Sequence, residues 1–529
     1  MPIADRGLPK SVVWQSMRAQ QTQIESLRAA FPMTGPFRPA QPGDFSLLRE
    51  RFRAAGFTEK SVSEVLEGKS DRSIDVAYVI RRTAEPSPFH SLVRLFLLGI
   101  PVVMENAVAA LSRQGVQCAF ESGLIEYVGN SVRAVACLRP WREFFLLSDF
   151  LPPQGEPLPS DFVMSGRSAS SRLLTRLTIR RRVAKALDLG TGAGIHALLA
   201  ASHADQVIAT DTSKRALNFA AMNARLNGID NVSFVEGNFF QPVAGEKFDL
   251  VVTNPPFIIS PQSGLMFQNA ELERDQVSEL VLRESPSYLR EGAFAVSLIS
   301  WVHETEEGWA SRPCAWVDGS GCDFWLLRAT SQDPLNYAAG SLRQTQSIGS
   351  RRYSELLDKW LQFDREQGFV RLALGAAILR KRVSRKNWIH CEDLSGAAIT
   401  TDASEQIERV FAAEDFLATA NEEELLDVRV TIHPDHVLEQ KLVAGDDGWM
   451  SQSLVLKAAG GIEHRAAIDP RVLVFLSRCN GTRTVRQLIS DVSQNDGVDF
   501  AAAAAAGLPL VRHLLRAGFL VVGHRCTVP

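Results

Sequence analysis

A polar, proline-containing segment directly follows an apolar run near the middle of the chain. The run 248–253 predicts a buried strand, and Asn254, Pro255, Pro256 and Phe257 come straight after it. The side-chain oxygen of Asn254 and the carbonyl of Pro255 can accept hydrogen bonds from an amino group, and the prolines stiffen the loop. Phe257 can stack on a flat group. The four residues therefore form a candidate catalytic site, although two prolines can also simply end a strand.

The chemistry that suits these residue types is attack by a planar nitrogen. The lone pair of an amide or aryl amine nitrogen is delocalised into a π-system, so the nitrogen is a poor nucleophile. A charged base is not the obvious remedy, because the proton can leave after attack. Acceptors aimed at the amino hydrogens, and alignment of the nitrogen with the transferred group, are what such a site needs.

A glycine loop precedes this segment by about sixty residues and predicts a cofactor site. The sequence Ala186-Leu-Asp-Leu-Gly-Thr-Gly-Ala-Gly194 ends an apolar strand, and the helical stretch 195–201 follows. Glycines permit a tight turn and a close approach of ligand to backbone, and backbone amides there can bind an anionic group, such as the carboxylate of S-adenosylmethionine. The spacing Gly192-x-Gly194-x-x-Ala197 also fits the relaxed dinucleotide fingerprint, and a purely structural turn stays open. The candidate cofactor-binding residues of this loop are Asp188, Gly190, Thr191, Gly192, Ala193 and Gly194.

Two further strand ends add polar residues. Asp211 and Thr212 close the next predicted strand, about twenty residues beyond the loop, where a carboxylate can accept hydrogen bonds from both ribose hydroxyls. Asn238 and Phe239 follow the third strand, where they can contact the edge and the face of an adenine ring. A strand-end aspartate is also a common helix cap, and Gly237-Asn238 is also a common turn.

The stretch between these elements carries a resemblance to a known family. It contains Ala216-Leu-Asn-Phe-Ala-Ala-Met-Asn223, Asn227-Gly228 and Pro242-Val-Ala-Gly-Glu-Lys-Phe-Asp249. With these motifs the chain resembles class I S-adenosylmethionine-dependent methyltransferases of the Asn-Pro-Pro-Phe/Tyr type. It looks most like the release-factor glutamine methyltransferases, and the small-domain ribosomal RNA guanine methyltransferases are similar too.

The resemblance implies a role for each motif. The glycine loop and Asp211 would hold S-adenosyl-L-methionine, Asn238 would contact its adenine, and Asn254 to Phe257 would grip the target nitrogen, with Asn254 also beside the cofactor. Two positions depart from the family: release-factor enzymes usually have Tyr at the position of Phe257 and Asp at that of Asn238. The flanking regions also do not resemble the substrate domain of those enzymes.

These observations predict an N-methyltransferase that acts on a planar amide or amino nitrogen. We expect a protein glutamine as acceptor, in a substrate such as a translation factor; the alternative is an exocyclic amine of an RNA or DNA base. An NAD-dependent oxidoreductase would leave Asn254–Phe257 unexplained. A non-catalytic scaffold conflicts with the intact glycine loop, Asp211 and Asn254.

Composition fits a multidomain globular protein. The chain has 529 residues, a formal net charge of −3 and 45% apolar residues, so nonspecific nucleic-acid binding is not its expected main role. Its seven cysteines form no CxxC pair, which favours a reducing compartment. No signal-peptide pattern opens the chain, and the apolar stretch 92–104 is short and interrupted by Arg94 and Pro101. We therefore expect a cytoplasmic protein without a membrane span.

The pattern along the chain predicts four parts. A flexible arm covers 1–43, a helical, winged-helix-like domain 44–160, the methyltransferase domain 161–386, and a further domain, again winged-helix-like, 387–529. The third part alternates strand and helix, which predicts an α/β fold with a doubly wound, mostly parallel, seven-stranded sheet. Its expected strands are 184–189, 206–210, 232–235, 248–253, 293–299, 324–329 and 372–379, with a helical insertion at 334–368.

Three other signals have simpler explanations. His433-Pro-Asp-His436 can hold a metal, but a surface loop is the expected interpretation, and no metal is predicted. Arginines 172, 176 and 180 would share a helix face, and a basic run at 380–386 ends the last strand; solvated faces are the default for both. His196 is expected to begin a helix rather than to contact the cofactor.

Overall fold

The computed structural model describes most of the chain. The predicted arm at 1–43 lies outside the described residues except for residues 36–37, and Arg385 of the basic run and Cys526 also lie outside them. The described residues are 36–37, 45–68, 74–152, 158–261, 274–343, 345–346, 348–383, 386–394, 399–445 and 448–523.

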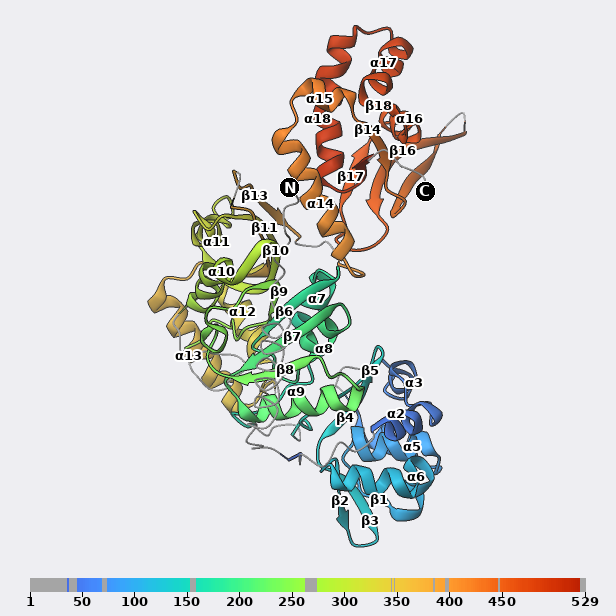
Figure 1. Cartoon of the computed structure of the whole chain (residues 1–529), viewed down its shortest axis with the longest axis vertical. Helices are drawn as coiled ribbons and strands as arrows, with labels where there is room; N and C mark the ends of the chain where they lie inside the picture. The colour runs from blue at the N-terminus through green and yellow to red at the C-terminus, as the bar shows by residue number, and fades with distance from the viewer. Residues whose placement is uncertain are drawn as a thin grey trace, which may run out of the picture. The chain divides into compact units, whose positions relative to one another are not determined.

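The chain divides into two compact units, and each unit combines separate segments of the sequence (Figure 1). The first contains Met1–Ser168, Val183–Tyr288 and Pro334–Gly368; the second contains Ala169–Arg182, Leu289–Asp333 and Phe369–Pro529. Among the described residues, the large sheet has eight strands. The predicted α/β fold is confirmed, but the predicted count of seven strands is wrong. The additional strand, β13 (Ile389–Asp393), is short, polar and partly exposed, so it has no apolar run that would predict it.

Four strands of the large sheet belong to the first unit, and they run parallel to one another. They lie in the order β9-β6-β7-β8 and match the first four predicted strands. Parallel strands need crossover connections, and here helices supply them, as the alternating pattern predicted. The bounds are β6 Val183–Leu189, α8 Ile195–Ala201, β7 Ala204–Asp211, α9 Lys214–Asn227, β8 Val232–Glu236, η3 Gln241–Val243, β9 Phe248–Thr253 and α10 Gln276–Tyr288.

Helix α9 joins the sheet to the N-terminal elements. Ser213 caps its first turn by accepting from the Ala216 amide, and Gly228, at φ 72°, ends it. Asn223 and Asn227, one helical turn apart, each exchange a pair of hydrogen bonds with the backbone of β5 (Phe144–Ser148), at Leu147 and Phe145 respectively. The N-terminal elements are therefore attached to the same helix that follows Asp211.

The N-terminal elements are helices followed by two hairpins. The predicted helical character of this part is confirmed, and Val128 pairs with Ser131 across a turn at Gly129-Asn130. Two strands, β3 and β4, divide the stretch 131–141. The winged-helix interpretation stays a prediction. The bounds are α2 Phe45–Ala54, α3 Glu59–Val65, α4 Val76–Arg82, α5 Pro88–Leu92, η2 Val93–Leu97, β1 Val102–Val103, α6 Met104–Glu121, β2 Ile125–Val128, β3 Ser131–Ala134, β4 Cys137–Trp141 and β5 Phe144–Ser148.

The helical insertion predicted at 334–368 is present as two helices, α12 (Pro334–Leu342) and α13 (Arg351–Gln367). In sequence they connect two strands of the second unit, yet both helices belong to the first unit. Ser350 caps α13 by accepting from the Tyr353 amide, and Gly368, at φ 67°, ends it. The insertion is therefore a part of the unit that carries Asn254.

In the second unit, the strands of the large sheet lie in the order β13-β11-β12-β10. The last predicted strand, β12, runs antiparallel to both of its neighbours, and β11 and β13 run parallel. The bounds are α7 Ala169–Leu177, β10 Leu289–His303, α11 Ser311–Val317, β11 Cys322–Gln332 and β12 Arg371–Lys381.

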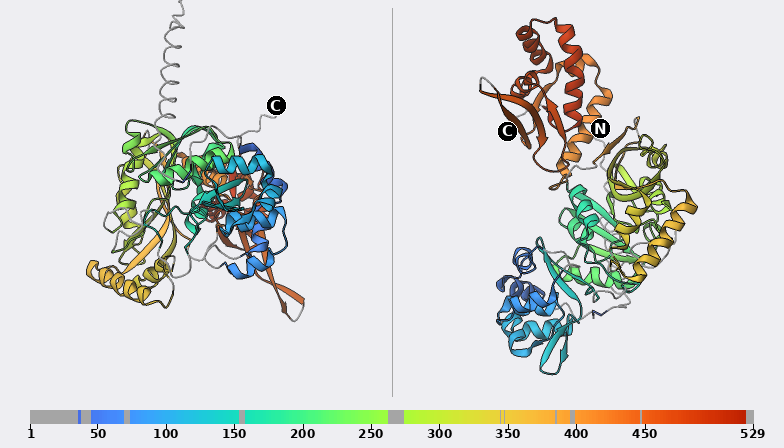
Figure 2. Two further views of the ribbon diagram at one scale, coloured as in Figure 1. Left: turned by 90° about the horizontal axis from the view of Figure 1, so that it is seen from below. Right: turned by 180° about the vertical axis from the view of Figure 1, so that it is seen from behind.

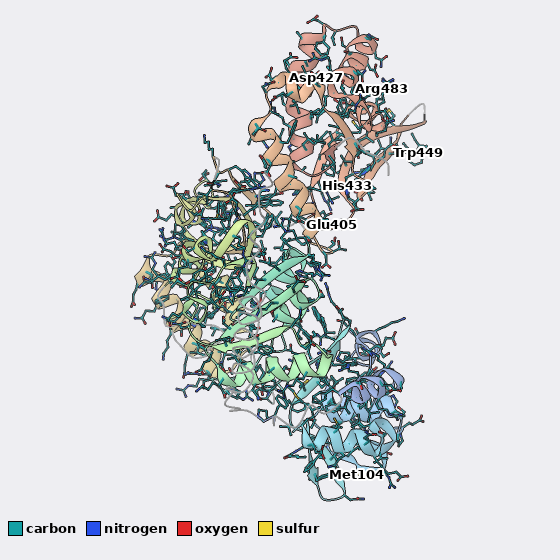
Figure 3. The ribbon with its side chains drawn as sticks, viewed as in Figure 1. Met104, Glu405, Asp427, His433, Trp449 and Arg483 are labelled. Carbon is teal, nitrogen blue, oxygen red and sulfur yellow. The ribbon has the colours of Figure 1, made fainter. Side chains whose placement is uncertain are left out.

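The C-terminal elements follow in the same unit (Figure 2). Three helices and a short strand occupy 470–522, and Thr484 caps α17 in a capping box with Gln487. The long hairpin of β15 and β16 was not predicted; Trp449 near its turn is 74% exposed (Figure 3). The winged-helix interpretation again stays a prediction, as does the four-part division of the chain. The bounds are α14 Ser404–Thr419, α15 Glu422–Asp427, β14 Arg429–Ile432, β15 His436–Gly445, β16 Gly448–Ala458, β17 Arg465–Ile468, α16 Pro470–Ser477, β18 Asn480–Thr484, α17 Val485–Asp496, α18 Phe500–Arg516 and β19 Leu520–Val522.

Candidate active site

Strands β6 and β9 end level with each other, and the two most informative motifs begin there. Leu189 pairs with Thr253 in the parallel register of these strands. The buried hydroxyl of Thr253 donates to the Leu189 carbonyl at 2.8 Å, which fixes the two ends together. The glycine loop from Gly190 and the loop from Asn254 therefore leave neighbouring strands at the same edge of the sheet.

The three glycines of the loop serve different purposes. All three have positive φ, with 72° at Gly190, 55° at Gly192 and 89° at Gly194. A Cβ on Gly190 or Gly192 would meet no atom within 4 Å, so these positions leave open space beside the backbone. A Cβ on Gly194 would lie 2.9 Å from the Cβ of Ala220, so this glycine allows α9 to pack closely.

Asp188 holds the loop from inside the sheet. Its Oδ2 accepts from the Thr191 hydroxyl at 2.5 Å and from the Ala197 amide at 2.9 Å. Burial raises the pKa of Asp188 to about 7, although these two donors oppose the shift. Its Oδ1 is buried and has no hydrogen-bond partner among the described residues. Asp188 was predicted in this strand as a candidate cofactor-binding residue, but its bonds to Thr191 and Ala197 were not predicted.

Asp211 lies at the end of β7 and binds the glycine loop. Its Oδ2 accepts from the Gly192 amide at 2.9 Å, and its Oδ1 accepts from the Ser213 amide at 2.9 Å. Burial raises the pKa of this carboxyl, and backbone amides oppose the shift. Two carboxylate oxygens can accept about four hydrogen bonds, so capacity for hydroxyl donors remains. The neighbouring Thr212 is exposed.

The turn after β8 lies next to Asp211. The Gly237 amide donates to the Asp211 carbonyl at 3.0 Å, so the turn that carries Asn238 is fixed beside the end of β7. Asn238 is exposed, and Phe239 is half-buried with φ 43°. The following Phe240 is buried and stacks on Tyr288, with ring centroids 4.4 Å apart. Phe240 thus anchors the turn, a role that no sequence signal indicated.

The loop that begins at Asn254 is partly buried. Pro255 is buried, whereas Asn254, Pro256 and Phe257 are half-buried, as expected for residues beside an open site. Beyond them, the Ile259 amide donates to the hydroxyl of Tyr337 on α12 at 3.0 Å. Tyr337 lies 78 residues away in sequence, and no local pattern could have identified it.

The described residues fit S-adenosylmethionine. Gly190 and Gly192 leave space beside the loop, Asp211 keeps acceptor capacity, and the unpartnered Oδ1 of Asp188 adds a buried acceptor below the loop. No group of three or more His, Cys, Asp or Glu residues that could hold a metal ion occurs in the described ranges. Within those ranges, no helix is long and apolar enough to cross a membrane.

The histidines and the arginine helix singled out in the sequence are placed by the structure. His196 lies buried in α8, as predicted, and His433 lies in a loop before β15. The arginine helix is shorter than predicted: α7 ends at Leu177, so Arg180 lies beyond it and pairs with Asp402 at 3.3 Å.

The basic run at 380–386 was expected to be a solvated strand end, and this expectation is wrong for Arg380. Its guanidinium is buried and pairs with Asp323 at 2.7 Å and with Asp415. Arg382 also pairs with Asp415, at 3.2 Å. These two arginines of the basic run are therefore occupied within the protein.

Comparison with known proteins relates three segments of the chain to other proteins. A family model described as a methyltransferase small domain matches residues 164–290, and two domains of unknown function match 54–135 and 408–522. The release factor glutamine methyltransferase of Xylella fastidiosa (strain 9a5c) is 38% identical over 136 residues, which are 23% of this chain and 47% of that protein. The ribosomal protein uL3 glutamine methyltransferase of Bradyrhizobium diazoefficiens is 31% identical over 192 residues, which are 33% of this chain and 59% of that protein.

A solved methyltransferase from Pyrococcus furiosus is 16% identical, covers 43% of this chain and 88% of its own, and has a TM-score of 0.26. The chain spans about half the length of the curated relatives it matches. The segment with the methyltransferase-domain match, 164–290, includes the glycine loop, Asp211 and Asn254. Residues 164–290 are therefore similar to a methyltransferase small domain, and the predicted resemblance to the release factor glutamine methyltransferases is confirmed.

Proposed function

We propose that this chain transfers a methyl group from S-adenosylmethionine to the side-chain amide nitrogen of a glutamine in a protein. The observation that carries the proposal is the level pairing of Leu189 with Thr253, which brings the glycine loop and Asn254–Phe257 to one edge of the sheet. Relatives named for glutamine methylation of release factors and of ribosomal protein uL3 favour a protein of the translation machinery as substrate.

In this proposal the cofactor lies over the glycine loop. Backbone at Gly190 and Gly192 approaches it closely because no side chain intervenes, and Asp211 accepts hydrogen bonds from its ribose hydroxyls. Thr212 and Ala193 flank these contacts, while Asn238 and Phe239 lie at the adenine end. S-Adenosylmethionine supplies an electrophilic methyl group on a sulfonium sulfur.

The loop after β9 orients the acceptor. The Asn254 side-chain oxygen and the Pro255 carbonyl accept hydrogen bonds from the amide hydrogens, and Phe257 stacks on the flat amide. These contacts aim the nitrogen at the methyl carbon, so the nitrogen–carbon bond forms in line with the carbon–sulfur bond that breaks. The nitrogen then loses one proton to solvent, which restores a neutral, methylated amide.

The alternative acceptor is an exocyclic amine of a nucleobase, which presents a similarly flat nitrogen. Recognition of nucleic acid would need cations free to contact phosphates. Arg380 and Arg382 are engaged by Asp323 and Asp415, and Arg180 pairs with Asp402. The net charge of −3 adds no attraction over the whole chain. The protein acceptor is therefore the better-supported choice.

A methyl-transfer assay tests the proposal directly. The purified chain is incubated with methyl-labelled S-adenosylmethionine and, separately, with a release factor, ribosomal protein uL3 and total RNA. Peptide mass spectrometry should then locate one added methyl group on a glutamine of one of the two proteins. The Asn254→Ala variant is the control for contaminating activity. Label in RNA, with none in either protein, would contradict the glutamine assignment and favour the nucleobase.

A further inference from the structure

Helices α12 and α13 pack against the segment that follows Asn254–Phe257. Their contact forms a small apolar cluster whose buried members are Ala338, Leu342, Leu356 and Trp360. Ile258, the residue directly after Phe257, packs against this cluster. The helix pair therefore contacts the loop one residue beyond the aromatic ring that would stack on the acceptor.

Tyr337 connects this cluster to the loop backbone. Its ring packs against the cluster and lies 6.3 Å from the ring of Trp360, measured between centroids. Its hydroxyl accepts a hydrogen bond from the Ile259 amide at 3.0 Å. Ile259 is only 1% exposed, so its amide would lose a partner that water cannot easily replace.

The loop is therefore held at two points. At its start, Thr253 donates to Leu189 on the neighbouring strand; at its far end, Ile259 donates to Tyr337. Asn254 to Phe257 lie between these points. A site that relies on preorganised acceptors loses rate when they drift, even by about 1 Å.

We propose that Tyr337 is a positioning residue for methyl transfer, which fixes the loop of Asn254 to Phe257 through the Ile259 amide. This inference rests on the proposed function, because it assigns the loop to the acceptor. Tyr337 itself is placed outside the reacting atoms and acts through the backbone that carries them. Helix α12, which carries Tyr337, thereby supports the acceptor loop.

The test compares Tyr337→Phe with Tyr353→Phe. Both tyrosines pack against the same cluster, and both variants keep the ring and remove only the hydroxyl. Within the described residues, no hydrogen bond of the Tyr353 hydroxyl is present, which makes it a matched control. Hydrogen exchange of a peptide that covers Ile259 reports the loop directly, without any methyl acceptor.

In Tyr337→Phe, exchange at Ile259 should become roughly tenfold to a hundredfold faster, as expected for a lost buried hydrogen bond. The kcat for methylation of the release factor or uL3 should fall roughly tenfold or more, while S-adenosylmethionine affinity stays unchanged. Tyr353→Phe should alter none of these values.

Unchanged exchange in Tyr337→Phe, or an equal change in both variants, would overturn the role of Tyr337. An equal loss of cofactor affinity and kcat in Tyr337→Phe would also overturn it, because it would indicate general damage. If the wild-type chain methylates neither protein, the proposed function fails. The exchange and cofactor-binding measurements then still decide whether Tyr337 holds the loop.

Discussion

The loops that follow β6 and β9 are stabilised by residues that lie at different distances from them along the sequence. After β6, Asp188 binds Thr191 three residues away, and Asp211 binds Gly192 across 19 residues. After β9, Thr253 reaches Leu189 across 64 residues, and Ile259 reaches Tyr337 across 78. The first loop thus carries most of its own supports, whereas the second depends on distant parts of the chain.

This difference separates two kinds of function. The loop after β6 would bind the cofactor. The residues that support this loop all lie within one short βαβ unit. The loop after β9 would bind the acceptor, and its supports include a helical insertion. Changes in the first loop should therefore alter cofactor affinity, and changes around the second should alter turnover.

Asn254→Ala should produce the largest effect on catalysis. It removes a preorganised acceptor aimed at the substrate nitrogen, so kcat should fall by roughly a hundredfold or more, while S-adenosylmethionine affinity changes little. Steady-state kinetics with the identified acceptor and calorimetry with the cofactor measure the two quantities. Normal turnover in the variant would mean that Asn254 has no catalytic role.

The same contrast explains what the sequence could predict. The seven expected strands were located because apolar runs alternate with helical periods, and the glycine loop was recognised because its constraints are local. Tyr337 and Phe240 were missed because their roles arise only from packing. Arg380 was misjudged because no pattern near it indicates its partners, Asp323 and Asp415.

Gly194→Ala should destabilise the fold rather than weaken binding alone. The added Cβ would lie 2.9 Å from Ala220 at φ 89°, so both strain and overpacking apply, and the loss should be roughly 2–4 kcal/mol. Gly192→Ala is the matched control: it also has positive φ, but its Cβ meets open space, so roughly 1–2 kcal/mol is expected. Urea unfolding without cofactor measures both. Equal losses of unfolding free energy in the two variants would show that the contact with α9 does not contribute to stability.

Asp211→Ala should mainly weaken binding of the cofactor. Loss of hydrogen bonds to a charged group corresponds to roughly 1.5–3 kcal/mol, or about a tenfold to hundredfold higher Kd for S-adenosylmethionine. Part of this loss comes from releasing the Gly192 amide, so Asp211→Asn, which keeps an acceptor, should lose less. Calorimetry compares the variants. Tight NAD binding by the wild type, without S-adenosylmethionine binding, would contradict the assigned cofactor.

The smallest predicted effect concerns the helix pair that supports the second loop. Asp364 on α13 follows Leu356 and Trp360 at four-residue intervals, which places the carboxyl on the same buried helix face. It is 2% exposed, and its Oδ2 has no hydrogen-bond partner among the described residues. Burial raises the pKa of this carboxyl from 3.8 to about 6.

Asp364 should therefore make stability depend on pH in a defined direction. The unfolded carboxyl ionises above about pH 3.8, but the folded one only above about 6, so unfolding releases a proton between these values. Raising the pH through this window should lower the stability of the wild type, and the loss should be complete above about pH 7. Asp364→Asn stays neutral, so its Tm should fall less over the same range, and its advantage at pH 8 should be on the order of 1 kcal/mol. Thermal unfolding of both proteins from pH 4 to 8 measures the difference. If the difference in Tm between the two proteins does not change with pH, the Asp364 carboxyl is solvated. Water would then reach the buried face of α13 that carries Leu356 and Trp360.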